Sequence, residues 1–293
     1  MSQRAIRSII KAQAVSDGAG VKIYRSLGLQ QHLRLDPFLM LDCFGSAEAS
    51  DYIAGFPAHP HRGFETVTYM LAGHMLHEDH LGNQGHLKSG GVQWMTAGRG
   101  IIHSEMPQQQ SGLMQGFQLW LNLPAAEKMK AAAYVDLTPD QIPQVAISEH
   151  SWVKVIAGDF RPDGQSVIKG PVQGLSTAPL YLDVSLHAGE VVHVDIPAGH
   201  NALVYPFVGE VQLGDEHAHV GTHQAAVLTD GTALTVRSSV PARFLVLAAK
   251  PIGEPIVQYG PFVMNTVAEI EQAIRDYQAG TLTDGAATTL TFR

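Results

Sequence analysis

The sequence predicts an all-β protein with two antiparallel barrels or sandwiches and one helix near its end. Short runs rich in β-branched and aromatic residues recur along the chain, and the 29 glycines and 16 prolines are scattered between them. A proline-containing stretch near the middle interrupts these runs, and a clear helical pattern begins near residue 266. Short strands separated by turn residues at this spacing are typical of antiparallel sandwiches and barrels.

The strand-like runs fall into two groups. With 293 residues and roughly 150 residues per domain, the length suggests about two domains. The first group includes TVTYML, VQWMTA and GFQLWLNL, and the second includes WVKVIAG, LYLDVSL and ARFLVLAA. Residues 123–144 contain three prolines and lack strand alternation, so we interpret them as the connection. We therefore predict domains at residues 1–130 and 131–293, each built from short strands of similar composition.

The helix is predicted from a capping box, in which Thr266 is the N-cap and Glu269 the third helical residue. Gly280 fits the C-terminal end of this helix. The apolar stripe that we expect to dock on a barrel consists of Val267, Ile270, Ile274 and Tyr277.

Composition excludes several classes of function. The chain has 19 basic and 27 acidic residues, a net charge of −8, which argues against direct nucleic-acid binding. The single cysteine, Cys43, excludes an intramolecular disulfide and fits a reducing compartment. No apolar run is long enough for a signal peptide or a spanning helix, so we expect a cytoplasmic protein without a membrane partner.

The histidines of the stretch AHPHRGFETVTY raise the question of a metal site. His59 and His61 stand two apart, and Pro60 between them suits an extended backbone. Residues two apart in a strand point to the same face, as a pair of metal ligands must. A chance pair is the alternative, because the chain contains 15 histidines.

A second block of sequence favours a metal site over a chance pair of histidines. In TAGRGIIHSEMP, His103 and Glu105 also stand two apart and follow a glycine-rich turn. Two adjacent strands could each offer two convergent ligands, giving three neutral imidazoles and one carboxylate. A divalent ion so bound keeps a net positive charge and open positions, which suits Lewis-acid or oxygen chemistry. A cysteine-type zinc site is excluded, because no thiolate is near.

These blocks resemble the cupin signature, and more closely the pirin family of two-barrel cupins (bicupins). The stretches that carry the resemblance are HPHRGFETVTY, GNQGHLKSGGVQWMTAGRGIIHSE, FQLWLNLP and EPIVQYGPFVMNTVAEIEQA. The resemblance implies two cupin barrels, a metal in the first and none in the second. It also implies iron, Fe²⁺, as the usual ion, with other divalent metals as alternatives. The implied ligands are His59, His61, His103 and Glu105.

The second block departs from the general cupin motif. Gly98-Arg99-Gly100 stands where a proline would begin the turn, and the carboxylate of Glu105 is an addition. A plain cupin would use Glu65 as a ligand. We interpret Glu65 instead as a residue that orients a ligating histidine.

Other histidines have simpler interpretations. His74, His77 and His80 recur every third residue, which does not place all three on one face of a strand, so we interpret them as surface or loop histidines. His217 and His219 form a second pair, but nothing downstream of them resembles GRGIIHSE. We therefore predict one metal per chain.

Two functions fit the resemblance. The first is a flavonol 2,4-dioxygenase, or quercetinase, in which an aromatic substrate such as quercetin reacts with dioxygen and carbon monoxide is released. Glu105 or Glu65 would accept the proton of the substrate hydroxyl. The second is a metal-dependent interaction protein, a partner of transcription regulators or metabolic enzymes, without turnover.

Overall fold

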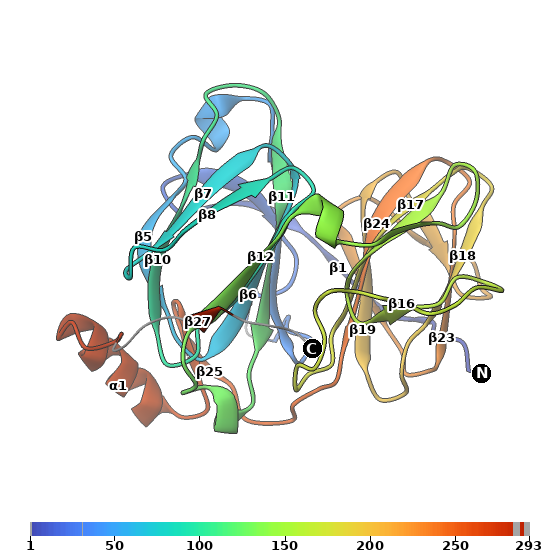
Figure 1. Cartoon of the computed structure of the whole chain (residues 1–293). Helices are drawn as coiled ribbons and strands as arrows, with labels where there is room; N and C mark the ends of the chain where they lie inside the picture. The colour runs from blue at the N-terminus through green and yellow to red at the C-terminus, as the bar shows by residue number, and fades with distance from the viewer. Residues whose placement is uncertain (1, 31, 284–287, 290–293) are drawn as a thin grey trace.

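The computed structural model describes residues 2–30, 32–283 and 288–289. Two antiparallel β-barrels lie side by side, each built from one large and one small sheet (Figure 1). The strand-rich fold and the single described α-helix confirm the predicted fold class. Three short 3₁₀ helices complete the connections: η1 (Ala49–Asp51), η2 (Ala125–Glu127) and η3 (Pro139–Gln141).

The first barrel contains the site described below. Across its large sheet the order is β2 (Gln13–Asp17), β3 (Val21–Arg25), β4 (Phe38–Ser46), β11 (Met114–Asn122), β6 (Phe64–Ala72), β9 (Val92–Thr96), β12 (Ala133–Leu137) and β27 (Thr288–Thr289). Across its small sheet the order is β5 (Phe56–His61), β10 (Ile101–Pro107), β7 (His74–Asp79) and β8 (Gln84–Lys88).

The second barrel repeats this plan. Its large sheet consists of β1 (Ile6–Lys11), β22 (Gln224–Leu228), β19 (Asn201–Val208), β24 (Ala242–Ala249), β17 (Leu180–Leu186), β14 (Trp152–Ala157) and β13 (Gln144–Ala146). Its small sheet consists of β18 (Val191–Asp195), β23 (Ala233–Arg237), β20 (Val211–Leu213) and β21 (Ala218–Val220). Two hairpins stand apart, β15 (Asp159–Phe160) with β16 (Ile168–Lys169) and β25 (Val257–Tyr259) with β26 (Phe262–Met264).

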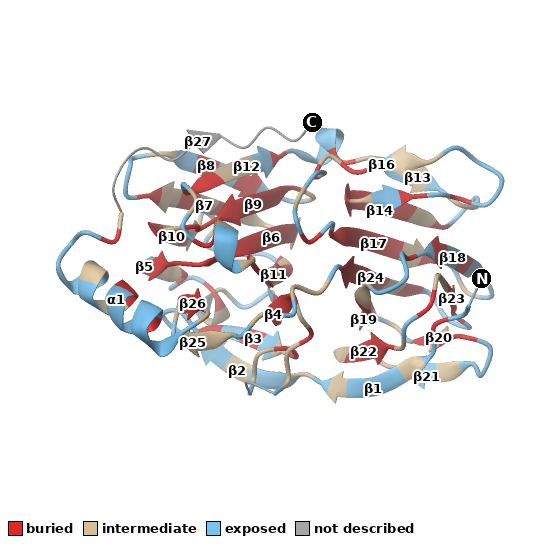
Figure 2. Cartoon of the chain, turned by 90° about the horizontal axis from the view of Figure 1, so that it is seen from below, coloured by how far each residue is buried: buried red, intermediate tan, exposed pale blue. Residues whose placement is uncertain are grey.

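The two large sheets pack against each other through one apolar core. Val67, Trp94 and Phe117 from the first barrel join Leu203 and Leu245 from the second in a single buried cluster. A polar contact crosses the same interface, where the Tyr69 hydroxyl lies 2.6 Å from a carboxylate oxygen of Asp183. Figure 2 shows how buried residues fill the central strands of both barrels. The barrels therefore form one packed unit rather than two independent domains joined by a linker.

Three segments pack on the barrel opposite to the one that their place in the sequence predicts. The N-terminal β1 pairs with β22 of the second barrel, whereas β12 pairs with β9 of the first. Residues 251–283, here called the C-terminal strap, pack on the first barrel, where Ile102 joins a cluster with Phe262, Ile270 and Leu282. The division at residues 130 and 131 stays a prediction, but these three segments lie across it.

The predicted helix is confirmed as α1 (Val267–Gln278), with the capping box of Thr266 and Glu269 in place. Its docking stripe is only partly as expected. Ile270 is buried together with Ala273, whereas Val267 and Tyr277 are 62% and 42% exposed. The helix therefore contacts the barrel through a narrower face than the apolar pattern predicts.

Candidate metal centre

Two paired strands hold the histidines of the site. In the antiparallel register of β5 and β10, His59 lies opposite His103 and His61 lies opposite Ile101. Alternate residues of a strand share a face, so His59, His61 and His103 point to the same side of this small sheet. Gly63 follows the pair with a φ of +91°, and a Cβ there would collide with the Val263 carbonyl of the strap. A side chain at this position would push the strap away from the strand.

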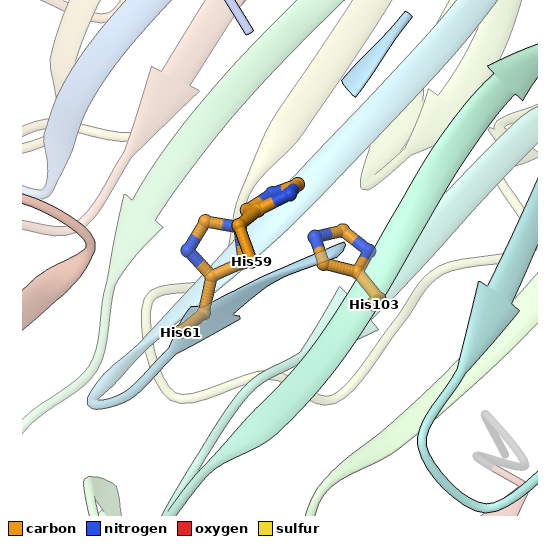
Figure 3. A group of neighbouring side chains, drawn as sticks. All are labelled: His59, His61 and His103. Atoms are coloured by element: carbon orange, nitrogen blue, oxygen red, sulfur yellow. The ribbon is translucent and has the colours of Figure 1, made fainter. Parts of the chain in front are cut away.

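The three imidazoles converge. One nitrogen from each histidine can be chosen so that all three lie within 4.8 Å of one another (Figure 3). Within the described part of the chain this is the only group of three or more His, Cys, Asp or Glu residues close enough to hold a metal. The ring centroids of His59 and His103 are 4.4 Å apart, and those of His61 and His103 are 4.9 Å apart.

The donor atoms fit a divalent metal ion. His61 Nδ1 and His103 Nε2 are buried without a hydrogen-bond partner among the described residues. His59 Nδ1 lies 2.8 Å from the carbonyl oxygen of Pro57, which requires a proton on Nδ1 and leaves a lone pair on Nε2. Burial, followed by repulsion from neighbouring imidazoles, holds the pKa of His61 and of His103 well below the ordinary value. Neutral imidazoles are the form that binds a metal.

Glu105 lies in the same barrel, beside but not within the three-histidine group. Thr68 Oγ1 lies 3.1 Å from its Oε1, and Gln118 Nε2 lies 3.5 Å from its Oε2. Burial raises the pKa of the Glu105 carboxyl, and the charge of His59 opposes this shift. The pairing of β10 with β5 shifts between His103 and Glu105, which changes the direction of the strand between them. The role of Glu105 as fourth ligand stays a prediction.

Glu65 lies on the other face of its sheet. Its carboxylate accepts hydrogen bonds from Thr96 Oγ1 at 2.7 Å and Trp94 Nε1 at 3.2 Å, and Lys130 Nζ lies 3.8 Å away. Burial raises its pKa, opposed first by Lys130. Strand parity does not carry from His61 to Glu65, because the turn at Gly63 separates β5 from β6. The structure does not bring Glu65 together with the histidines.

His77 is the residue of the site that sequence reasoning missed. Its interpretation as a surface or loop histidine is wrong, because its side chain is 2% exposed and its Nδ1 lies 3.2 Å from His103 Nδ1. His74 and His80 do lie on the opposite face of the strand or beyond its end. The signal was present in strand parity, since Met75, His77 and Asp79 alternate inward along β7.

A cavity of about 810 Å³ lies beside the three-histidine group. His59, His61 and Glu105 line it, as do the aromatic side chains of Phe44 and Trp120. Ligand pockets are typically 300–1,000 Å³, mostly apolar with a few polar groups. The cavity is therefore large enough for a drug-sized aromatic molecule next to the histidines.

The C-terminal strap closes the back of the site. Arg62, next to His61, lies 2.6 Å from an Asp276 oxygen of α1 through Nη1 and donates to the Leu282 carbonyl through Nη2. Lys128 Nζ donates to the Gly63 carbonyl at 2.7 Å and to the Val263 carbonyl at 3.1 Å. The strand that carries His61 is thus tied to the last part of the described chain.

Two barrels in one chain, with a three-histidine group open to a cavity in the first, define a bicupin with a candidate metal centre. The family model described as Pirin matches residues 20–121, and the one described as Pirin C-terminal cupin domain matches residues 181–283. The chain belongs to the pirin family.

Named relatives and solved structures agree with this assignment. A Pseudomonas aeruginosa protein named "Putative quercetin 2,3-dioxygenase" is 51% identical, covering 95% of this chain and 98% of its own. Human Pirin is 39% identical, covering 94% of this chain and 93% of its own. A crystal structure of quercetin 2,3-dioxygenase from Acinetobacter baumannii is 34% identical, with a TM-score of 0.87 over 97% of this chain and 99% of that one. Within the described residues, no helix has the length and apolar character needed to cross a membrane.

Proposed function

We propose that this protein is a metal-dependent dioxygenase that cleaves flavonols such as quercetin and releases carbon monoxide. The observation that carries the proposal is the grouping of His59, His61 and His103, of which His59 and His61 line a large, partly aromatic cavity. The names of the Pseudomonas and Acinetobacter relatives support the same substrate class. We further propose a cytoplasmic location, which suits the single buried thiol of Cys43.

His59, His61 and His103 would hold one Fe²⁺ or a similar divalent ion, with Glu105 as the fourth ligand. Such an ion supplies Lewis acidity toward a substrate hydroxyl and redox chemistry toward dioxygen. The chain itself binds and orients the substrate. Phe44 and Trp120 line the cavity and would contact its aromatic rings.

A carboxylate must accept the proton of the flavonol 3-hydroxyl, and we assign this role to Glu105 rather than to Glu65. Thr68 and Gln118 hold the Glu105 carboxylate inside the cavity. Glu65 is engaged on the other face of the sheet by Trp94 and Thr96. The choice between the two carboxylates therefore follows from the face of the sheet on which each one lies.

The reaction consumes one flavonol and one dioxygen and yields one ring-opened ester and one carbon monoxide. The C2–C3 and C3–C4 bonds break, and C3 leaves with its own oxygen as carbon monoxide. Both atoms of dioxygen remain in the ester product, one at C2 and one at C4. The proton accepted from the 3-hydroxyl returns to the new carboxylate or to solvent, so the protein ends the cycle unchanged.

Gas analysis with Fe²⁺-loaded protein and quercetin tests the proposal. We expect the wild type and His80→Ala to release carbon monoxide and His103→Ala to release none above free Fe²⁺. His80 is a suitable control because it is an exposed histidine in the turn between β7 and β8, and β7 is the neighbour of the strand that carries His103. Equal release from wild type and His103→Ala would reject the enzyme and favour a metal-dependent interaction protein.

A further inference from the structure

His77 lies against His103 on β7, which pairs with one edge of β10, whereas β5 with His59 and His61 pairs with the other edge. Its ring centroid is 4.8 Å from that of His103, and the two Nδ1 atoms are 3.2 Å apart. The contact is buried on both sides, since His103 is 1% exposed and His77 is 2% exposed.

The geometry constrains the protons of both rings. Two neutral imidazoles can share an Nδ1···Nδ1 hydrogen bond only if one Nδ1 carries a proton and the other carries a lone pair. If His103 donates, its Nε2 keeps a lone pair, and this nitrogen is buried with no partner among the described residues. If His103 accepts, its Nε2 carries the proton and cannot bind a metal.

Neighbouring groups hold the His77 ring in place. Strand pairing sets His77 of β7 opposite Glu105 of β10, and Asp79 opposite His103. Asp79 is itself fixed, because its carboxylate accepts hydrogen bonds from the backbone nitrogens of Leu81 and Asn83. The ring of Tyr134 lies beside His77 with a centroid separation of 5.7 Å. The ring behind His103 is thus held by the sheet and by its neighbours.

We infer that His77 is a positioning residue that accepts the Nδ1 proton of His103, and so fixes the tautomer and the ring plane that present His103 Nε2 to the metal. A metal-ligating histidine usually donates its second nitrogen to a carboxylate, a carbonyl or water, and losing such a partner typically weakens metal binding 10–100-fold. Here a second imidazole takes that place. The inference rests on the metal centre of the proposed function but not on its substrate.

Three variants of the full-length protein test the inference. His77→Phe keeps the ring volume and removes the acceptor, whereas His77→Asn keeps an acceptor near the position of Nδ1. His74→Phe is the matched control, because it removes a histidine–histidine contact of 2.9 Å with His86 on the opposite face of the same strand. The unfolding free energy of each variant in urea shows whether a change in metal binding reflects global destabilisation.

Zn²⁺ affinity is measured by competition with a chromophoric chelator. We expect His77→Phe to raise the Kd by about 10–100-fold, and His77→Asn and His74→Phe to remain within about threefold of the wild type. A Kd of His77→Phe within threefold of the wild type would overturn the inference. It would also be overturned if His77→Asn lost as much affinity as His77→Phe, since a purely structural role or direct ligation by His77 would produce that result.

The tautomer of His103 is read from its imidazole ¹⁵N shifts in the metal-free protein. We expect a proton on Nδ1 in the wild type and a mixture of tautomers in His77→Phe. A proton on His103 Nε2 in the wild type would overturn the inference. Neither measurement involves quercetin, so a failure of the dioxygenase proposal and a failure of this inference are distinguishable.

Discussion

Replacing Asp276 by Asn removes the negative charge that faces Arg62, where α1 meets the residue that follows His61. The Nη1–Oδ2 distance is 2.6 Å, and the two side chains are 5% and 21% exposed. Removing one partner of a fully buried ion pair costs about 3–5 kcal/mol. Arg62 would keep the carbonyl oxygens of Leu282 and Arg99 as acceptors, so we expect Asp276→Asn to lower the unfolding free energy by about 2 kcal/mol.

The matched control lies on the same helix. Glu271 and Arg275 form a pair 3.9 Å apart with side chains 60% and 59% exposed. Exposed pairs of this kind contribute about 0–1 kcal/mol, so Glu271→Gln should change stability by less than about 0.5 kcal/mol.

Urea unfolding followed by fluorescence measures both variants, and a double-mutant cycle with Arg62→Met isolates the pair. Equal losses for Asp276→Asn and Glu271→Gln, or a coupling energy below about 0.5 kcal/mol, would refute the reasoning.

Three further predictions concern the site and its supports. Glu105→Gln should lower Fe²⁺ occupancy in elemental analysis while Glu65→Gln leaves it unchanged, and the reverse order would restore the ligand set of a plain cupin. Burial lowers the pKa of Lys128 from 10.5 to about 8, so the unfolded chain binds more protons between these values and the unfolding free energy should rise with pH across this window. In urea titrations at several pH values, Lys128→Met should remove the increase in unfolding free energy that Lys128 causes across this window. An unchanged dependence of the unfolding free energy on pH would show that Lys128 is not its source. Removing the metal with a chelator should lower stability by about 2.7 kcal/mol relative to metal at 100 times its Kd, whereas the melting temperature of His61→Ala should not respond to metal.

Strand parity in the sequence predicted that His59 and His61 share a face, because period-2 alternation needs no knowledge of the partner strand. The approach of His103 depends on the pairing of β5 with β10, which was expected from the family resemblance. Parity from His61 does not extend to Glu65, because the turn at Gly63 starts a new strand, and the Glu65 carboxylate is held by Thr96 and Trp94 instead. His77 was missed because its spacing from His74 and His80 was considered for the three residues together, although His77 alone has the inward parity of β7.

The capping box predicted the start of α1 correctly, because its signal is local. The pairing of β1 with β22 and the docking of the C-terminal strap had no comparable signal. Contacts between distant parts of the chain depend on which edges and faces are left open once both barrels have formed. Local pattern does not encode that choice.

The packing of the C-terminal strap on the first barrel affects the order in which the site forms during protein synthesis. The carbonyls of Val263 and Leu282 that hold Lys128 and Arg62 belong to residues that leave the ribosome after nearly all of the second barrel has been made. The strand that carries His59 and His61 is therefore translated early but gains these contacts only after the strands of the second barrel have been made. A fragment that stops at the end of the first barrel would contain every candidate ligand and still lack the contacts behind His61. That barrel alone should therefore be less stable than the full protein, because Arg62 and Lys128 lose these partners.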